Sequence, residues 1–93
     1  MIRSFKTKRT ERIWQGRVVT GLPHSIQELA RRKLRMINNA HAVVDLRIPP
    51  ANRLEMLNGD RKGQCSIRIN DQWRICFSWR DGDAYDVEIV DYH

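Results

Sequence analysis

The stretch VEIVDYH at residues 87–93 ends on three adjacent side chains that can transfer protons or bind phosphate: Asp91, Tyr92 and His93. Metal-free cleavage of RNA needs a base for the ribose 2′-hydroxyl, an acid for the leaving 5′-oxygen and cations around the phosphate. Imidazole, with an ordinary pKa of about 6.5, can serve as acid or base, and a phenol can donate to a phosphate or stack on a nucleobase. Taken alone, the stretch also fits an ordinary frayed chain end, which is the commoner case.

Cations suited to such a reaction are abundant. The chain carries a net charge of +6, and thirteen of its seventeen basic residues are arginine, whose planar fork pairs bidentately with phosphate. Residues 1–35 hold ten basic and two acidic side chains, so the first third favours a polyanionic partner such as nucleic acid over a merely solvated surface. The candidate phosphate-binding residues are Arg9, Arg12, Arg61, Lys62, Arg68 and Arg74.

Other classes of chemistry lack their signatures. The sequence contains no Gly-rich phosphate loop, no HExxH, no CxxC and no nucleophile elbow. Cys65 and Cys76 are too few and too isolated for a disulfide framework or a zinc site, so we expect free thiols and no metal or other cofactor. No apolar run approaches the ~20 residues that span a bilayer, and no signal peptide is visible. We therefore expect one domain, residues 1–93, located in the cytoplasm without a membrane partner.

The first half of the chain predicts helices. Residues 2–6 alternate as in a short strand, and residues 7–15 are typical of a short basic helix. A longer helix is predicted from the SIQE segment at 25–28, which has the form of a capping box, with Ile26, Leu29, Ala30, Leu34 and Ile37 on one face. Asn38 and Asn39 end or bend this helix, one more turn is expected within residues 40–46, and Pro49–Pro50 forces a break.

The second half has a period of two and predicts an antiparallel meander. Strands are expected at residues 53–57, 64–69 and 73–79, with a final strand after the hairpin signal Asp81-Gly82. The fold class is therefore α+β, with the N-terminal strand and one or two helices packed on a C-terminal antiparallel sheet. The apolar face would carry Ile67, Trp73, Phe77 and Val87, with Tyr85 on the same side as Val87 and Asp91. Arg68, Arg74 and Tyr92 are predicted on or beside the uncovered face.

Residues 52–93 resemble the C-terminal half of the HigB-type toxins of bacterial toxin–antitoxin systems, within the RelE/ParE superfamily. The resemblance rests on L-x-x-L-x-G-D-R at 54–61, N-x-x-W-R-I-x-F at 70–77, G-D-A-Y at 82–85 and the terminal D-Y-H, in the same order and at the same spacing. The opening MIRSFK also matches, so the likeness covers nearly the whole chain.

The resemblance implies a RelE-like, microbial-RNase-type fold and a ribosome-dependent endonuclease that cuts mRNA and inhibits translation. It also implies a HigA-like helix-turn-helix antitoxin as partner, with operator DNA contacted only through that antitoxin. Carried over by position, the site would comprise Asp91, Tyr92 and His93, with Arg74 as the sheet arginine.

One departure concerns residue 55. Relatives with the form L-H-P-L-K-G-D carry a histidine important for cleavage where this chain has Glu55, and a lysine where it has Asn58. Glutamate can act as a base but cannot stabilise phosphate charge as a cation does, so we expect altered or weaker cleavage. A subgroup of the family shares the L-E-x-L form.

Two other functions remain open on the sequence. A binding module that has lost catalysis would inhibit translation by occupancy, or act as co-repressor with its antitoxin, and Glu55 favours this alternative. A ParE-like action on DNA gyrase is the other, but the terminal D-Y-H argues against it.

Overall fold

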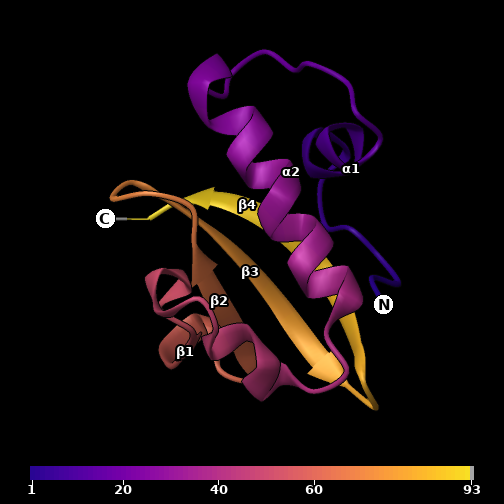
Figure 1. The fold of residues 1–93 in the computed structure, drawn as a ribbon, viewed down its shortest axis with the longest axis vertical. Helices are drawn as coiled ribbons and strands as arrows, with labels where there is room; N and C mark the ends of the chain where they lie inside the picture. The colour runs from indigo at the N-terminus through magenta and orange to yellow at the C-terminus, as the bar shows by residue number, and fades with distance from the viewer. Residues whose placement is uncertain (93) are drawn as a thin grey trace.

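The computed structural model describes residues 1–92, which form one antiparallel sheet with two helices packed on one of its faces (Figure 1). The four strands lie in the order β1-β2-β3-β4. The predicted α+β architecture is therefore confirmed. The elements are α1 (Lys8–Trp14), α2 (His24–Asn39), β1 (Glu55–Met56), β2 (Gln64–Arg68), β3 (Trp73–Arg80) and β4 (Asp83–Asp91), with short 3-10 helices η1 (Val43–Arg47), η2 (Pro50–Asn52) and η3 (Gly59–Arg61).

Helix α2 crosses the sheet because its apolar residues recur on one face. Ile26, Ala30, Leu34 and Ile37 are buried, as predicted. The predicted capping box is wrong: the helix begins at His24, directly after Pro23, and no side chain caps its first turn. Glu28, the expected partner in that box, instead accepts a hydrogen bond from Arg31 at 2.8 Å.

Helix α1 matches the predicted basic helix, and its cap and contacts tie it to the last strand. The Thr7 hydroxyl accepts a hydrogen bond from the Thr10 backbone N–H, which stabilises the helix start. Thr10 is fully buried, and its hydroxyl accepts from the backbone N–H of Ile89 at 3.0 Å. This contact ties α1 to the last part of β4, close to Tyr92.

The alternation in β2 and β3 places side chains as predicted. Arg68 lies opposite Arg74, and Ser66 lies opposite Cys76, all on the face that the helices leave open. Cys65 lies opposite Phe77 on the covered face, so the two cysteines are on different sides, and both are free, as expected. Both are also buried. Burial raises the pKa of both thiols.

A bulge in β4 changes the predicted position of Tyr85. Cys76 pairs with Glu88 and Ser78 pairs with Tyr85, so two residues of β4 lie opposite one residue of β3. Asp86, in the bulge, has a left-handed φ of 53°. The prediction that Tyr85 and Val87 share a face is therefore wrong: Tyr85 lies on the open face, where the Arg80 guanidinium stacks on its ring at 4.2 Å.

The strand predicted at residues 2–6 is wrong, because only isolated bridges form there, and the strand predicted at residues 53–57 is shorter than expected. The N-terminal segment makes only single parallel bridges to β4, from Ile2 to Ala84 and from Phe5 to Val87. The strand predicted at residues 53–57 is wrong at its ends, because β1 comprises only Glu55–Met56 and Arg53 adopts a left-handed conformation.

The N-terminus is held against the β3–β4 hairpin. The terminal amine lies 3.2 Å from the Asp83 carboxylate, and Arg3 Nε lies 3.1 Å from it. The hydrogen bond from Arg3, followed by that from the terminal amine, lowers the pKa of Asp83.

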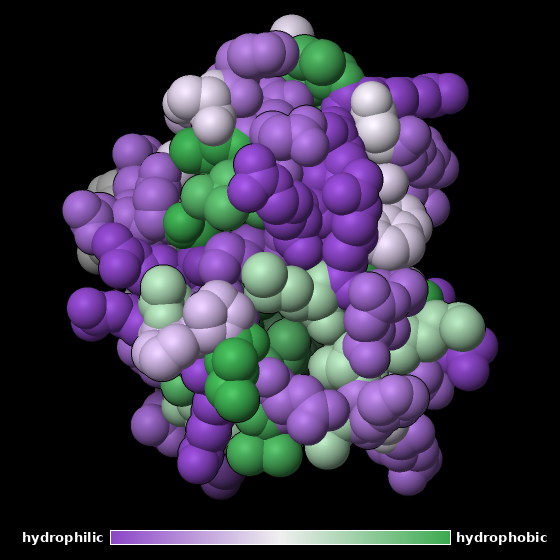
Figure 2. All heavy atoms as spheres, viewed as in Figure 1, coloured by the Kyte–Doolittle hydropathy of each residue, from purple (hydrophilic) through white to green (hydrophobic). Residues whose placement is uncertain are grey.

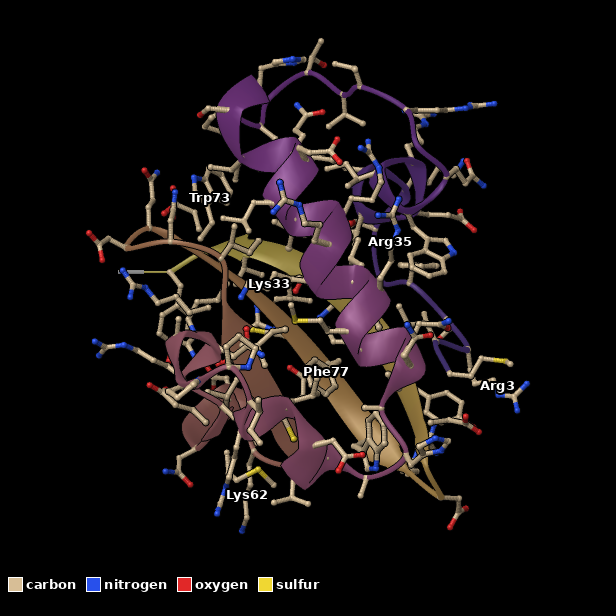
Figure 3. All side chains as sticks on the ribbon, in the orientation of Figure 1. Arg3, Lys33, Arg35, Lys62, Trp73 and Phe77 are labelled. Carbon is tan, nitrogen blue, oxygen red and sulfur yellow. The ribbon has the colours of Figure 1, made fainter. Side chains whose placement is uncertain are left out.

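The core lies between α2 and the sheet, where Figure 3 shows Phe77 beneath the helix. Phe77, Leu34, Ile37, Ile67 and Val87 are fully buried, and complete burial of such a side chain stabilises the fold by about 1.5–3 kcal/mol. The predicted core is thereby confirmed, except that Leu29 is only partly buried.

The helix side of the molecule is largely hydrophilic, with apolar residues scattered over it (Figure 2). Arg32 and Arg35 of α2 are exposed. None of the helices within residues 1–92 is long and apolar enough to cross a membrane.

Candidate functional site

A polar pocket of about 320 Å³ lies on the open face of the sheet, where β1, β2 and β3 meet the end of the chain. Its walls combine side chains from β1, β2 and β3 with residues of the β2–β3 turn and the segment before β1. We call it the arginine pocket, and its lining residues are Arg53, Glu55, Arg68, Asn70, Asp71, Arg74 and Tyr92.

Arg74 is the best-held side chain of this pocket. It is 7% exposed, and its Nε donates to the Ser66 hydroxyl at 2.8 Å. Its Nη2 donates to the Arg53 carbonyl at 2.7 Å and to the Ser66 carbonyl at 3.4 Å. A guanidinium has five N–H donors, so three are fixed by the protein and the two on Nη1 are left. Among residues 1–92, the nearest acidic atom to Nη1 is Oε1 of Glu55, at 3.8 Å.

The Arg53 carbonyl can receive Arg74 because the chain reverses locally at this residue. Arg53 has φ 45° and ψ 56°, immediately after η2. Asn52 fixes this turn: it is fully buried, donates to the Leu46 carbonyl at 3.2 Å and accepts from the Lys33 amine at 2.5 Å. Lys33 is itself buried, and its desolvation lowers its pKa.

Glu55 stands at the edge of the sheet. Strand β1 pairs Glu55 with Ser66, which puts its carboxylate on the same face as Arg74. The side chain is 51% exposed, so it is open to a ligand entering the pocket. The 3.8 Å separation from Arg74 Nη1 is longer than a hydrogen bond, so Glu55 does not occupy the two Nη1 donors.

Tyr92 closes the other side of the pocket. Its backbone N–H donates to the Gln72 carbonyl at 2.6 Å, and the Arg74 guanidinium lies 5.6 Å from its ring centroid. A cation at this distance stabilises the ring position by about 0.5–1 kcal/mol. The prediction that Tyr92 lies on the open face beside Arg74 is confirmed.

Asp91 faces away from Arg74. It pairs with Trp73, whose side chain belongs to the covered face, and its carboxylate accepts from the Gln72 amide at 3.1 Å. This contact ties the end of β4 to the β2–β3 turn, but Asp91 does not line the pocket. His93 lies outside the described residues.

The β2–β3 turn supplies the remaining wall. The Asn70 side chain accepts from the backbone N–H groups of Gln72 and Trp73, which shapes the turn. Arg68 is ion-paired with Asp71, a fully exposed residue whose carboxylate is easily displaced. Within residues 1–92, no group of three or more His, Cys, Asp and Glu side chains is placed to hold a metal ion.

The sequence also matches a known protein family over nearly its whole length. Residues 3–93 match the family described as the RelE-like toxin of the type II toxin–antitoxin system HigB. The chain belongs to the HigB-like toxin family. The expected family is thus confirmed.

Individual members of the HigB-like family show how far the likeness extends. "Endoribonuclease HigB" of Proteus vulgaris is 34% identical over 93 residues, which is the full length of both chains. "Toxin HigB-1" of Vibrio cholerae is 52% identical over 63 residues, covering 68% of this chain and 66% of that relative, just under two thirds of its length.

Solved structures show that the HigB-like chain shares a fold with YafQ and with YoeB. A mutant of YafQ from Escherichia coli gives a TM-score of 0.66 at 13% identity, covering 98% of this chain and 91% of that one. The YoeB–YefM complex from Staphylococcus aureus gives 0.62 at 14% identity, covering 100% and 98%. The expected RelE-like fold is confirmed.

The other predicted phosphate-binding residues lie elsewhere. Arg61 and Lys62 are on the open face but in a different pocket. Arg9 belongs to α1, donates to the carbonyls of Ile89 and Gly21, and lies 5.9 Å from the Trp73 ring on the covered side. Arg12 is exposed on the same helix.

Sequence reasoning missed the residues that hold Arg74. Ser66 was not singled out in the sequence, yet it is fully buried and accepts a hydrogen bond from the guanidinium. The available signal was the alternation of β2, which puts Ser66 on the same face as Arg74 and one same-face pair away from it across the two strands. The role of Arg53 could not be predicted, because neither its residue type nor its neighbours indicate a left-handed backbone conformation.

Proposed function

We propose that this protein is the toxin of a type II module and cleaves mRNA on the ribosome, in the cytoplasm, with the arginine pocket as its active site. The observation that carries the proposal is the Arg74 guanidinium. Three of its N–H donors are fixed inside the protein, and its Nη1 edge faces a pocket that also holds a carboxylate and a phenol.

In this proposal Arg74 binds the scissile phosphate through Nη1. The contacts with Ser66 and Arg53 hold the guanidinium before the RNA arrives, so little reorganisation is needed as negative charge builds on the phosphate. Arg68 adds a second cation once its exposed partner Asp71 is displaced.

Glu55 is the proposed general base. A carboxylate can accept the proton of the ribose 2′-hydroxyl when the two groups are within hydrogen-bond reach. The position of Glu55, 3.8 Å from Arg74 Nη1, would place that hydroxyl beside the phosphate that Arg74 binds. Catalysis by a glutamate at this position is expected to be weaker than with a histidine, because a carboxylate adds no positive charge.

The C-terminal residues complete the proposed site. Tyr92 orients the phosphate or stacks on a nucleobase, and His93 serves as the general acid for the leaving 5′-oxygen. Asp91 is a positioning residue, because its contact with Gln72 holds the strand end that carries Tyr92 and His93.

The proposed partners follow from charge and family. The exposed arginines on the helix side, Arg12, Arg32 and Arg35, would hold ribosomal RNA by phosphate contacts. A HigA-like helix-turn-helix antitoxin would neutralise the toxin and carry it to operator DNA.

The test is induction of the toxin in cells, followed by measurement of growth and mapping of mRNA 5′ ends. The wild type should arrest growth and produce discrete cuts in frame with the coding sequence. Single substitutions Arg74→Ala, Tyr92→Ala and His93→Ala should each reduce both effects. Wild-type growth arrest and cutting by all three variants would overturn the site assignment.

A second candidate, inhibition by occupancy, is favoured by one observation. No histidine lines the arginine pocket among residues 1–92, and Glu55 stands where relatives carry one. A toxin that acts by occupancy would arrest growth and leave intact message on stalled ribosomes, so the same 5′-end map separates the two candidates.

A further inference from the structure

A second polar pocket, of about 480 Å³, lies farther along the open face of the sheet. It is built by η3, the start of β2, the second half of β3 and the N-terminal segment beside β4. We call it the lysine pocket, and its lining residues are Lys6, Asp60, Arg61, Lys62, Gln64 and Ser78. All six side chains are polar or charged, which disfavours an apolar ligand.

The two pockets share one face and are aligned along the strands. Gln64 pairs with Ser78 in the lysine pocket, and Arg68 pairs with Arg74 in the arginine pocket. Ser78 follows Arg74 by four residues, so the two cross-strand pairs are separated by roughly 13 Å at ~3.3 Å per residue. Figure 3 shows Lys62 near the end of the sheet away from Trp73, the residue next to Arg74. A nucleic acid strand of a few nucleotides spans such a distance.

An ion pair lies between the pockets. Arg61 Nη2 lies 3.1 Å from Glu88 Oε1, and Arg61 Nη1 donates to the Gln64 amide oxygen at 3.1 Å. Glu88 pairs with Cys76, midway between Arg74 and Ser78 on β3. Arg61, which lines the lysine pocket, therefore extends across the sheet to the level of Cys76, on the side of that pocket nearer Arg74.

Two further cations of the lysine pocket are available for a ligand. Lys6 and Lys62 are exposed, and neither forms an ion pair with any residue in the described part of the chain. They approach from different sides of the pocket, Lys6 from the segment beside β4 and Lys62 from the segment before β2. The pocket can thus surround one anionic group from two sides.

We propose that the lysine pocket binds a backbone phosphate of the same RNA strand whose scissile phosphate occupies the arginine pocket. This inference rests on the proposed function. Lys6 and Lys62 contact the flanking phosphate directly, and Arg61, positioned by Glu88 and Gln64, lies beside the RNA between the two sites. RNA is favoured over an acidic peptide because the pocket continues the open face on which the reaction takes place.

The test uses the purified full chain and two RNA oligonucleotides of three and six nucleotides, with 2′-O-methyl riboses that prevent cleavage. Affinity is measured by fluorescence anisotropy at several salt concentrations. The longer RNA should bind several-fold more tightly, and its affinity should fall more steeply with salt, by about 0.7 in log–log slope for each added phosphate contact. The double variant Lys6→Ala/Lys62→Ala should bind both RNAs equally.

Two further variants sharpen the test. Glu88→Gln should tighten binding of the longer RNA, because it removes a negative charge between the pockets. Lys8→Ala/Arg47→Ala removes the same amount of charge as the Lys6/Lys62 variant, from outside both pockets, and serves as its control. Circular dichroism of each variant confirms that it is folded.

The proposal is overturned if the six-nucleotide RNA binds no more tightly than the three-nucleotide RNA, or if the Lys6/Lys62 variant binds as the wild type does. Binding of an oligoglutamate peptide that requires Lys6 and Lys62, without a gain for the longer RNA, would identify a protein partner and also overturn it. Failure of the proposed function would give a different result. The wild-type protein would bind the longer RNA more tightly through both pockets but would leave message uncut on the ribosome.

Discussion

Glu55→Gln tests the proposed base without changing the shape of the pocket. The substitution replaces one carboxylate oxygen by an NH2 group of similar size. The resulting amide cannot accept the proton that the carboxylate would take. Glu55 is half-exposed at the edge of the sheet, and its contact with Arg74 Nη1 is a 3.8 Å ion pair. The fold therefore depends little on its charge.

The expected effects on activity and stability differ in size. A general base contributes about 10²–10⁴-fold to a reaction rate, so cleavage by the variant should fall by that amount. A partly exposed ion pair contributes about 0–1 kcal/mol, and 1 kcal/mol corresponds to about 4–8 °C in Tm for a domain of this size. The Tm should therefore fall by no more than about 8 °C.

The assay is single-turnover cleavage of message on purified ribosomes, with thermal unfolding measured in parallel. Asp71→Asn is the matched control, because Asp71 is an exposed carboxylate of the same pocket and is assigned no proton transfer. It should leave the cleavage rate within a few-fold of wild type. Wild-type cleavage by Glu55→Gln, or an equal loss in both variants, would refute the assignment of Glu55 as the base.

Three further predictions concern the residues around the site and the hairpin. Ser66→Ala removes the acceptor of Arg74 Nε, so the free energy of unfolding should fall by about 1.5–3 kcal/mol in denaturant titrations. The lowered pKa of Asp83 stabilises the fold above its ordinary pKa of 3.8, and this stability is lost as pH falls through the lowered value. Unfolding measured between pH 5 and pH 2 should therefore show a weaker acid dependence for Asp83→Asn, and an unchanged dependence would contradict the assignment. Burial raises the pKa of Cys65 and Cys76, so a thiol reagent at pH 8 should modify both only after unfolding.

The sheet and the faces of its central strands could be predicted from the sequence because alternation has a fixed physical meaning. Once Phe77 is assigned to the covered face, Arg74 must lie on the other side, and Arg68 opposite it. The bulge at Asp86 could not be predicted from alternation, since one extra residue reverses the face of everything before it. Tyr85 was therefore placed on the wrong side.

The site was predictable only where it depends on strands. Arg74 and Tyr92 were brought together by parity along β3 and β4. The carbonyl of Arg53 was not, because its orientation depends on the left-handed turn after η2 and on the buried contact between Lys33 and Asn52. The burial of Lys33 could not be predicted, because in the sequence it cannot be told apart from the exposed basic residues beside it in α2.

The most direct measurement of the central claim is cleavage of a defined message on purified ribosomes by the wild type and by Arg74→Lys. The lysine keeps the positive charge. Its single ammonium group cannot donate hydrogen bonds to the Ser66 hydroxyl and the Arg53 carbonyl and also donate two N–H groups to a phosphate. We expect the wild-type protein to cut the message only when ribosomes are present, and Arg74→Lys to be slower by about 10²–10³-fold. An intact message with the wild type, or equal rates for the two proteins, would contradict the claim.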